Sequence, residues 1–209
     1  MLRKEQTDGV QTILLTPHFY PQQMYPTSFL ENRQRAFEQL LKCISSDNSM
    51  PRLIPGAEVL FCPGMYQWEQ LDALTLGETE YILIELPFGK WSEGVYTELV
   101  KIHDERGLTP VLAHIERYLP GFMINKFMKR LASLPVLLQS NCEFLIDDKT
   151  QRLAIKLIKE QKIHLIGSDC HRPNWRSPNM AQAREILLNN LDRNAISFLE
   201  DSENLILHG

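Results

Sequence analysis

The stretch Thr109-Pro-Val-Leu-Ala-His-Ile-Glu-Arg-Tyr118 joins a predicted strand directly to charged side chains. Its apolar run, residues 111–113, is typical of a short buried strand. His114, Glu116 and Arg117 follow at once, and such groups are costly to bury unless they have partners. We therefore expect the end of this strand to face a functional site.

Short apolar segments alternate with helical patterns along the rest of the chain. The predicted strands are 9–18, 52–59, 81–87, 109–113, 135–141 and 163–169. The predicted helices are 29–46, 92–106, 123–131 and 148–161, with two more patterns near Leu188 and Leu199. Thr27 and Ser28 are suitable N-cap residues, and Gly107 is suited to end a helix. Strands separated by helices predict a parallel sheet. Without a glycine-rich phosphate loop, this pattern favours a single-domain α/β barrel over a doubly wound nucleotide-binding fold.

Length and composition indicate one globular domain. A chain of 209 residues with 44% hydrophobic residues can bury a substantial core. A net charge of −4 and a pI near 5.9 argue against a nucleic-acid binder that relies on electrostatics alone. No apolar run approaches the roughly 20 residues that span a bilayer, and the polar start predicts no signal peptide. The cysteines lack C-x-x-C spacing, so we expect a reducing, cytoplasmic location; they are Cys43, Cys62, Cys142 and Cys170.

Polar side chains recur where the predicted strands end, and in a parallel barrel these carboxyl ends form the active face. The residues there are His18, Glu58, Glu85, His114, Asn141, Asp169 and His171. Each alone is ordinary, since a single histidine is usually a satisfied structural residue and a single glutamate is usually solvated. Together they predict a metal site, because crowded carboxylates repel unless a cation neutralises them. Imidazole with carboxylate suits Mn, Fe or Zn. His103, His164 and His208 lie elsewhere and are expected to be ordinary.

Two arginines are candidate anion-binding residues. Arg117 follows His114 closely, and Arg176 follows His171. A guanidinium group makes paired hydrogen bonds to phosphate that a lysine cannot make. Either arginine alone could be a surface residue, but beside candidate metal ligands both predict substrate binding.

These motifs together resemble a known family. They are Thr-Pro-His18, Gly-Ala-Glu58, Ile-Glu85, Ala-His114-Ile-Glu-Arg117-Tyr, and Ser-Asp169-Cys-His171 followed by Arg176. Over nearly its whole length the chain is similar to the manganese-dependent tyrosine-protein phosphatases of bacterial capsule and exopolysaccharide loci. These are of the CpsB/CapC type and belong to the polymerase-and-histidinol-phosphatase (PHP) superfamily. The resemblance implies a distorted β/α barrel, two or three Mn²⁺ ions, and removal of phosphate from the phosphotyrosine cluster of a bacterial tyrosine kinase.

The resemblance also implies roles for individual residues. The implied metal ligands are His18, Glu58, Glu85, His114, Asp169 and His171. Arg117 and Arg176 correspond to the catalytic and substrate-binding contacts to phosphate. The implied reaction is metal-assisted hydrolysis of a phosphomonoester, in which these arginines stabilise charge on the phosphoryl oxygens.

The chain departs from the family pattern at its N-terminus. The family opens with a strand ending in His-x-His and an acidic Asp-Asp-Gly segment, and this sequence shows neither. We therefore expect residues 1–209 to form one PHP-like domain without its first strand, with an open barrel edge and incomplete metal ligation. Either the true start lies upstream or the chain is a copy with impaired catalysis, and the intact remainder of the site favours the first.

Two other functions fit the same residues. The chain could hydrolyse a small phosphomonoester such as histidinol phosphate, or it could bind phosphotyrosine without hydrolysing it. The aromatic segment 19–26, with Trp91 and Trp175, could stack on a phenolic ring and slightly favours an aromatic substrate.

A third alternative concerns the segment Cys170-His-Arg-Pro-Asn-Trp-Arg176-Ser177, which fits the C-x5-R-[ST] spacing of cysteine-dependent tyrosine phosphatases. Such enzymes use a low-pKa thiolate and a cradle of backbone N–H groups around the phosphate. Pro173 removes one of these donors, and no glycine supplies left-handed backbone. We therefore expect that Cys170 is not the nucleophile.

Overall fold

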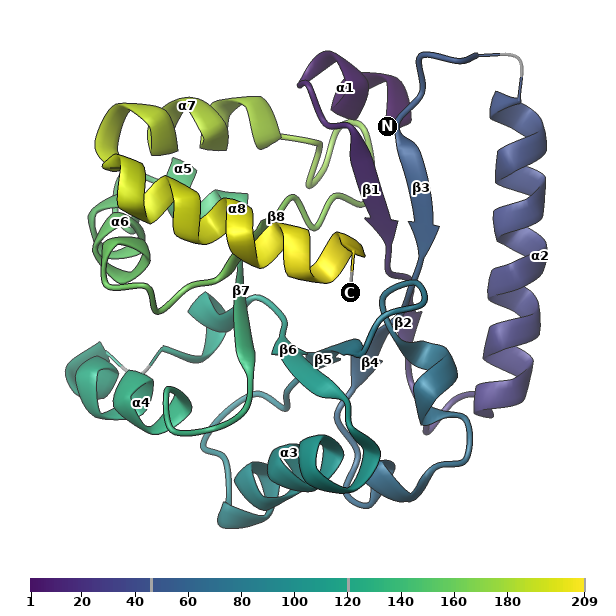
Figure 1. Cartoon of the computed structure of the whole chain (residues 1–209), viewed down its shortest axis with the longest axis horizontal. Coiled ribbons are helices and arrows are strands. Elements are labelled where there is room, and N and C mark those ends of the chain that lie inside the picture. The colour runs from purple at the N-terminus through teal and green to yellow at the C-terminus, as the bar shows by residue number, and fades with distance from the viewer. Residues whose placement is uncertain (46, 120, 209) are drawn as a thin grey trace.

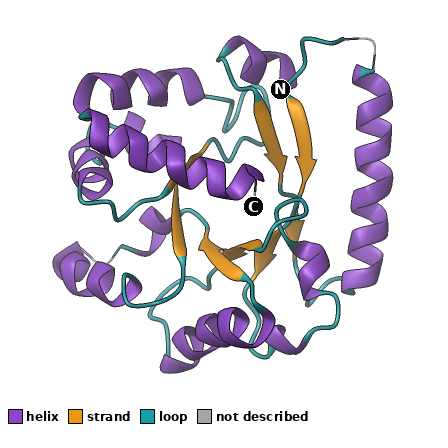
Figure 2. Ribbon diagram, in the orientation of Figure 1, coloured by secondary structure: helices purple, strands orange, loops and turns teal. Residues whose placement is uncertain are grey.

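Parallel strands form a curled sheet, and most of the helices surround its outer side (Figures 1 and 2). The computed structural model describes residues 1–45, 47–119 and 121–208. The strands are β1 (Thr12–Leu15), β2 (His18–Phe19), β3 (Arg52–Pro55), β4 (Glu58–Leu60), β5 (Tyr81–Glu85), β6 (Thr109–Leu112), β7 (Leu137–Asn141) and β8 (Leu165–Gly167). The predicted parallel sheet is confirmed.

The sheet is an open half-barrel. Its six-stranded part has the order β2-β4-β5-β6-β7-β8, and β1 pairs with β3 beside it. The strands predicted at 9–18 and 52–59 are each divided, at Thr16-Pro17 and at Gly56-Ala57 respectively. Pro17 has no N–H to donate to a neighbouring strand, which favours a break there. The second halves, β2 and β4, pair in a register that places His18 opposite Glu58.

Helices follow most strands, as the sequence predicts. They are α1 (Leu2–Thr7), α2 (Pro26–Ile44), α3 (Glu93–Arg106), α4 (Ile124–Leu131), α5 (Cys142–Ile146), α6 (Gln151–Lys159), α7 (Met180–Asn190) and α8 (Arg193–His208). The N-cap prediction for α2 was wrong, because the helix already begins at Pro26, whose fixed φ suits a first helical position. The predicted end at Ser46 lies outside the described residues. Gly107 ends α3 with φ of 67°, as expected, whereas the short helix α5 was not predicted.

The side chains of β5 alternate between two packing layers. Ile82 and Ile84 are fully buried in the main core, between the sheet and the outer helices. Tyr81 belongs to a second cluster inside the curl, and Leu83 packs against it. Because successive side chains point to opposite faces, Glu85 lies on the inner face as well, at the carboxyl end of the strand.

Helix α8 closes the inner layer at the amino ends of the strands. It crosses the front of the curled sheet, and its C-terminal end lies near the middle of the curl (Figure 1). Ile206 of α8 is only 2% exposed and joins the inner cluster with Tyr81, the first residue of β5. The apolar inner cluster therefore lies at one end of the curl, and the polar strand ends lie at the other.

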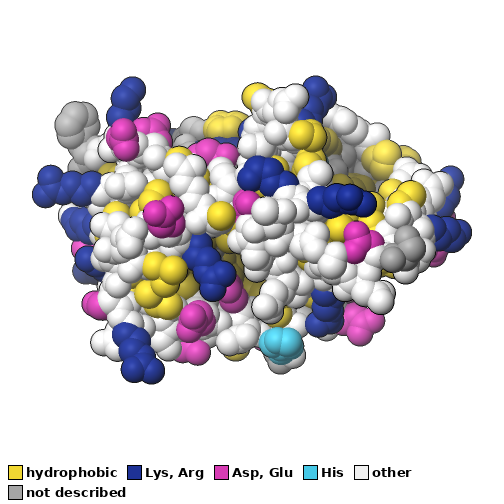
Figure 3. Space-filling model, turned by 90° about the horizontal axis from the view of Figure 1, so that it is seen from above, with side chains coloured by type: hydrophobic (Ala, Val, Ile, Leu, Met, Phe, Trp, Pro, Cys, Tyr) yellow, Lys and Arg dark blue, Asp and Glu magenta, His cyan; other side chains and the backbone are white. Residues whose placement is uncertain are grey.

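One face of the molecule is mixed in charge. On the face seen from above in Figure 3, acidic and basic side chains are interspersed with small apolar areas. Among the described residues, no helix is both long enough and apolar enough to cross a bilayer.

Candidate metal and phosphate site

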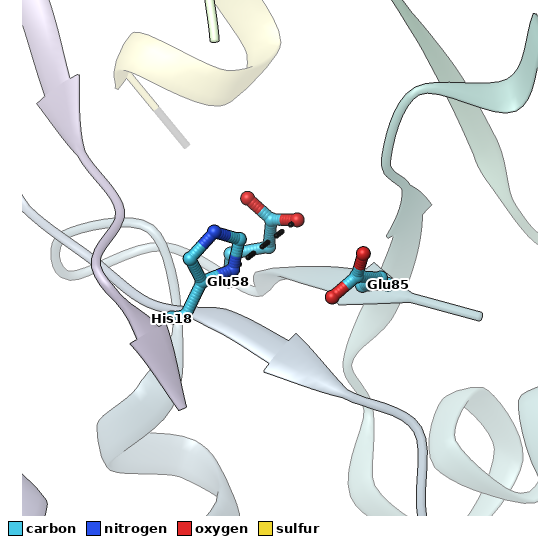
Figure 4. A group of neighbouring side chains, drawn as sticks. All are labelled: His18, Glu58 and Glu85. Atoms are coloured by element: carbon cyan, nitrogen blue, oxygen red, sulfur yellow. Dashed lines mark ion pairs between the residues drawn. The ribbon is translucent and has the colours of Figure 1, made fainter. Parts of the chain in front are cut away.

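Three side chains on neighbouring strands form the centre of the site. His18 begins β2, Glu58 begins β4, and Glu85 ends β5. One nitrogen or oxygen atom from each lies within 4.8 Å of the others. His18 and Glu58 point toward one another, with 3.7 Å between Nδ1 and Oε1, and Glu85 lies on the next strand (Figure 4). The two carboxylates are almost completely buried, so their repulsion requires compensation from neighbouring positive charge.

His114 supplies part of that compensation through an unusual backbone conformation. It follows β6 with φ of 38° and ψ of 54°, in the left-handed region that few residues other than glycine adopt. Simple alternation would place residue 114 on the outer face with Leu112. Instead the His114 ring is buried beside the carboxylates, with Nε2 3.0 Å from Oε1 of Glu58 and 3.5 Å from Oε1 of Glu85. Its backbone N–H donates to Oε1 of Gln139 at 2.6 Å, which holds this conformation in place.

The hydrogen bonds between His114 and the two carboxylates also shift the pKa values of Glu85 and His114. The hydrogen bond to His114 holds the pKa of Glu85 below its usual value, despite the opposing effect of burial. Burial would lower the pKa of His114, but hydrogen bonds to Glu58 and Glu85 outweigh it and raise that pKa. Glu85 is therefore ionised at neutral pH and is a competent oxygen donor for a cation.

Asp169 forms the second half of the site, after β8. Its Oδ2 accepts hydrogen bonds from Nη2 of Arg117 at 2.8 Å and from Nδ2 of Asn141 at 2.9 Å. Arg176 makes an ion pair with the same oxygen. Two guanidinium groups from different loops thus converge on one anionic oxygen.

His171 joins the two halves. Its Nε2 lies 3.4 Å from Nε2 of His18 and 3.3 Å from Nη1 of Arg176. Its Nδ1 lies 2.8 Å from the carbonyl oxygen of Asp169, which fixes the tautomer with the proton on Nδ1. Nε2 therefore presents its lone pair to the site.

Backbone strain concentrates at this site. Of the described residues other than glycine, only His114, Gln161, Asp169 and Arg176 have positive φ. Three of these four belong to the site, and each such residue costs of the order of 1–3 kcal/mol unless its surroundings enforce the conformation. Strain of this kind is typical of functional sites and supports a role for these loops.

All eight predicted site residues lie in one connected network. His18, Glu58, Glu85, His114, Arg117, Asp169, His171 and Arg176 are linked by the contacts above. Apart from the two arginines, the network residues offer imidazole nitrogens and carboxylate oxygens as possible metal ligands. Nδ1 of His18 and Nδ1 of His114 are buried without a hydrogen-bond partner in the described structure. This donor set fits a borderline or hard divalent cation.

The three remaining histidines lie away from the network. His103 lies in α3, His164 accepts the N–H of Leu138, and His208 ends α8.

Two supporting residues were given no role by the sequence analysis: Gln139 was not named there, and Glu116 was named only as part of the strand end. Gln139 of β7 holds the His114 backbone, and its Nε2 donates to Oδ1 of Asn141 at 3.1 Å. Glu116 accepts the N–H of Asn141 at 3.3 Å, and burial raises its pKa. Alternation along β7 would have placed Gln139 on the inner face with Asn141, whereas nothing in the sequence predicts the contact of Glu116.

The loop after β8 does not form a phosphate cradle for Cys170. The N–H groups of His171 and Arg172 donate to the carbonyls of Arg176 and Trp175, and the N–H of Trp175 donates to Arg172. These donors are therefore engaged within the loop. Burial raises the pKa of the Cys170 thiol, which is opposite to what a thiolate nucleophile requires.

The chain is similar in sequence to known proteins. The model of a family described as "Capsular polysaccharide synthesis, CpsB/CapC" matches residues 1–206. The tyrosine-protein phosphatase YwqE of Bacillus subtilis (strain 168) is 26% identical over 196 residues, which cover 90% of this chain and 74% of YwqE. The tyrosine-protein phosphatase CpsB of Streptococcus pneumoniae is 27% identical over 202 residues, which cover 90% of this chain and 79% of CpsB.

The fold also matches a solved structure. It is described as "Crystal structures of YwqE from Bacillus subtilis and CpsB from Streptococcus pneumoniae, unique metal-dependent tyrosine phosphatases". The TM-score is 0.82 at 23% identity, and the match covers 99% of this chain and 85% of the other. The predicted PHP-type barrel fold is thereby confirmed.

Proposed function

We propose that this chain, which belongs to the CpsB/CapC family of capsular polysaccharide synthesis, is a metal-dependent protein-tyrosine phosphatase. The observation that carries the proposal is the convergence of two guanidinium groups on one anionic oxygen beside a cluster of imidazoles and carboxylates. A bound phosphate would accept hydrogen bonds from both arginines in place of Oδ2 of Asp169. The tyrosine-protein phosphatases among its relatives support this reaction.

We further propose the substrate, the metal and the location. The substrate is the phosphorylated tail of a bacterial tyrosine kinase that regulates capsule or exopolysaccharide synthesis. The metal is Mn²⁺, held by His18, Glu58, Glu85, His114, Asp169 and His171. When bound, such ions supply Lewis-acid polarisation of the phosphoryl oxygens and neutralise charge. The absence of disulfides among the described residues supports a cytoplasmic location.

The protein's own residues orient the substrate and its surroundings. Arg117 and Arg176 come from the loops after β6 and β8, so they approach the phosphate from two sides. Their fixed planar donors match two oxygens each, which stabilises the charge that builds up on the phosphoryl group. The Asp169 carbonyl keeps the proton of His171 on Nδ1. Nε2 of His171, which keeps its lone pair, is therefore the nitrogen that would ligate the cation.

The proposal is tested by hydrolysis of a phosphotyrosine peptide. Dialysis against a chelator should abolish phosphate release, and added Mn²⁺ should restore it. Arg176→Lys should lower kcat/KM by roughly 10- to 1,000-fold, because one charge remains but the paired donors are lost. His103→Ala, in α3 and outside the network, is a control substitution and should leave turnover unchanged.

Three results would contradict this function. Activity that persists without metal would rule out the metal-dependent reaction. Preferred hydrolysis of histidinol phosphate would identify a small-molecule phosphoesterase instead. Tight binding of the phosphopeptide with no phosphate release under added Mn²⁺ would identify a binding protein.

A further inference from the structure

Trp175 is an exposed aromatic residue next to a phosphate-binding candidate. Its side chain is 60% exposed, although an indole is among the costliest groups to leave in water. Of the aromatic residues that the sequence suggested for ring stacking, Phe19 and Trp91 are instead buried in the main core. Trp175 is therefore left as the tryptophan available to a ligand at this edge of the site.

The loop holds Trp175 in a defined position. His171 and Arg176 are joined by a backbone hydrogen bond of 2.9 Å. Between these two residues, Arg172 and Trp175 form an isolated antiparallel β-bridge. Pro173 restricts the backbone of the turn that joins them. The position of the indole is thus coupled to that of Arg176.

The indole also lies at the end of a row of rings. Tyr20 stacks on His18 with ring centres 5.4 Å apart, and His18 lies 5.6 Å from His171. Trp175 continues this row with an edge-on contact to His171 at 5.9 Å. The guanidinium carbon of Arg176 lies 5.6 Å from the centre of the Trp175 ring.

We propose that Trp175 is a specificity residue that stacks against the aromatic ring of an aryl phosphate bound by Arg176. This inference rests on the proposed function and extends it to the recognition of the leaving group. In an aryl phosphate a single oxygen separates phosphorus from the ring, so a phosphate on Arg176 brings that ring within reach of Trp175, whose ring centre lies 5.6 Å from the Arg176 guanidinium carbon. Aromatic pairs attract at centre-to-centre distances of about 4.5–7 Å. An alkyl phosphate has no ring for this contact.

The test compares two non-hydrolysable ligands on the full chain with Mn²⁺ present. Phenylphosphonate carries the ring and methylphosphonate does not, and their affinities are measured by calorimetry. Trp175→Ala should weaken phenylphosphonate by roughly 3- to 10-fold, the size of an aromatic pair interaction, and leave methylphosphonate unchanged. The KM for a phosphotyrosine peptide should rise by the same factor, with little change in kcat.

Two further variants sharpen the result. We expect phenylphosphonate to change the tryptophan fluorescence of the wild type. Trp175→Phe should keep most of the preference for phenylphosphonate but lose this fluorescence change. Phe88→Ala is the matched control, because Phe88 is also exposed but packs on Tyr118. It should leave the preference unchanged.

The outcomes separate the two proposals. If the wild type binds methylphosphonate but shows no preference for phenylphosphonate, the ring subsite is refuted and the phosphatase proposal stands. Equal weakening of both ligands by Trp175→Ala, or loss of the preference only in Phe88→Ala, would also refute it. Failure of the wild type to bind either ligand would overturn both proposals.

Discussion

Replacing Gln139 by leucine should damage the site without touching any candidate ligand. The Gln139 side chain accepts the backbone N–H of His114 and donates to Oδ1 of Asn141. Asn141 in turn donates to Asp169. One amide group therefore holds both halves of the site, and leucine keeps its approximate volume while removing every hydrogen bond.

The expected loss follows from the unsatisfied His114 N–H. A buried donor that loses its only partner costs about 1–3 kcal/mol of unfolding free energy. For a chain of this length, 1 kcal/mol corresponds to about 2–4 °C in Tm, so Tm should fall by roughly 2–12 °C. Residues that orient metal ligands typically change metal affinity about 10- to 100-fold when they are mutated. We expect Gln139→Leu to weaken Mn²⁺ binding within that range.

Thermal unfolding in a chelator and calorimetric titration with Mn²⁺ measure the two effects separately. Gly167 provides an internal check, because a Cβ atom there would lie 2.8 Å from Nε2 of Gln139. When Gly167→Ala is introduced alone, it should lower Tm and Mn²⁺ affinity by part of the amount expected for Gln139→Leu. When it is combined with Gln139→Ala, it should lower them little further. Unchanged Tm and metal affinity in Gln139→Leu, or additive effects of the two alanine variants, would refute the reasoning.

Three other outcomes are expected. Ile206→Ala should lower the unfolding free energy by about 2–5 kcal/mol in urea titrations, because it opens the inner cluster. Leu205→Ala, half exposed on the same helix, should change it by less than about 1 kcal/mol; equal losses would show that Ile206 does not contribute more to the inner cluster than an exposed leucine. Burial lowers the pKa of His164 below its unfolded value near 6.5, so below that pH the unfolded state binds more protons and stability falls. His164→Asn should flatten this fall, which is at most about 1.4 kcal/mol per pH unit; an identical slope in both proteins would contradict it. Cys170→Ser should retain the phosphatase activity, and abolished activity would revive the thiolate mechanism.

Much of the fold and the candidate site follows from local patterns. The apolar runs predict the strands, because buried parallel strands carry few polar residues. The inward position of Glu85 follows from counting along β5, since alternation has a period of two residues. The ends of the predicted strands also identify six residues of the network, because parallel strands bring their carboxyl ends to one edge. Arg117 and Arg176 follow in the loops after these ends.

Other features depend on contacts between distant segments. The sequence 109–118 does not predict that His114 adopts left-handed backbone, since the partner that stabilises it, Gln139, belongs to another strand. The helix α5 was missed because a stretch of five residues is too short for helical periodicity to be recognised.

The sequence by itself determined which residues carry nitrogen and oxygen donors, and that these residues lie in or just after strands of a parallel sheet. The breaks in the first two predicted strands, which leave His18 and Glu58 at the start of β2 and β4, appeared only in the structure. Only the tertiary structure decided that Arg117 and Arg176 meet at Asp169, that Trp91 is core, and that Trp175 is exposed. The physical reason is that side-chain type and alternation are encoded within a few residues. The meeting of loops after β6 and β8, by contrast, depends on how far the whole sheet curls.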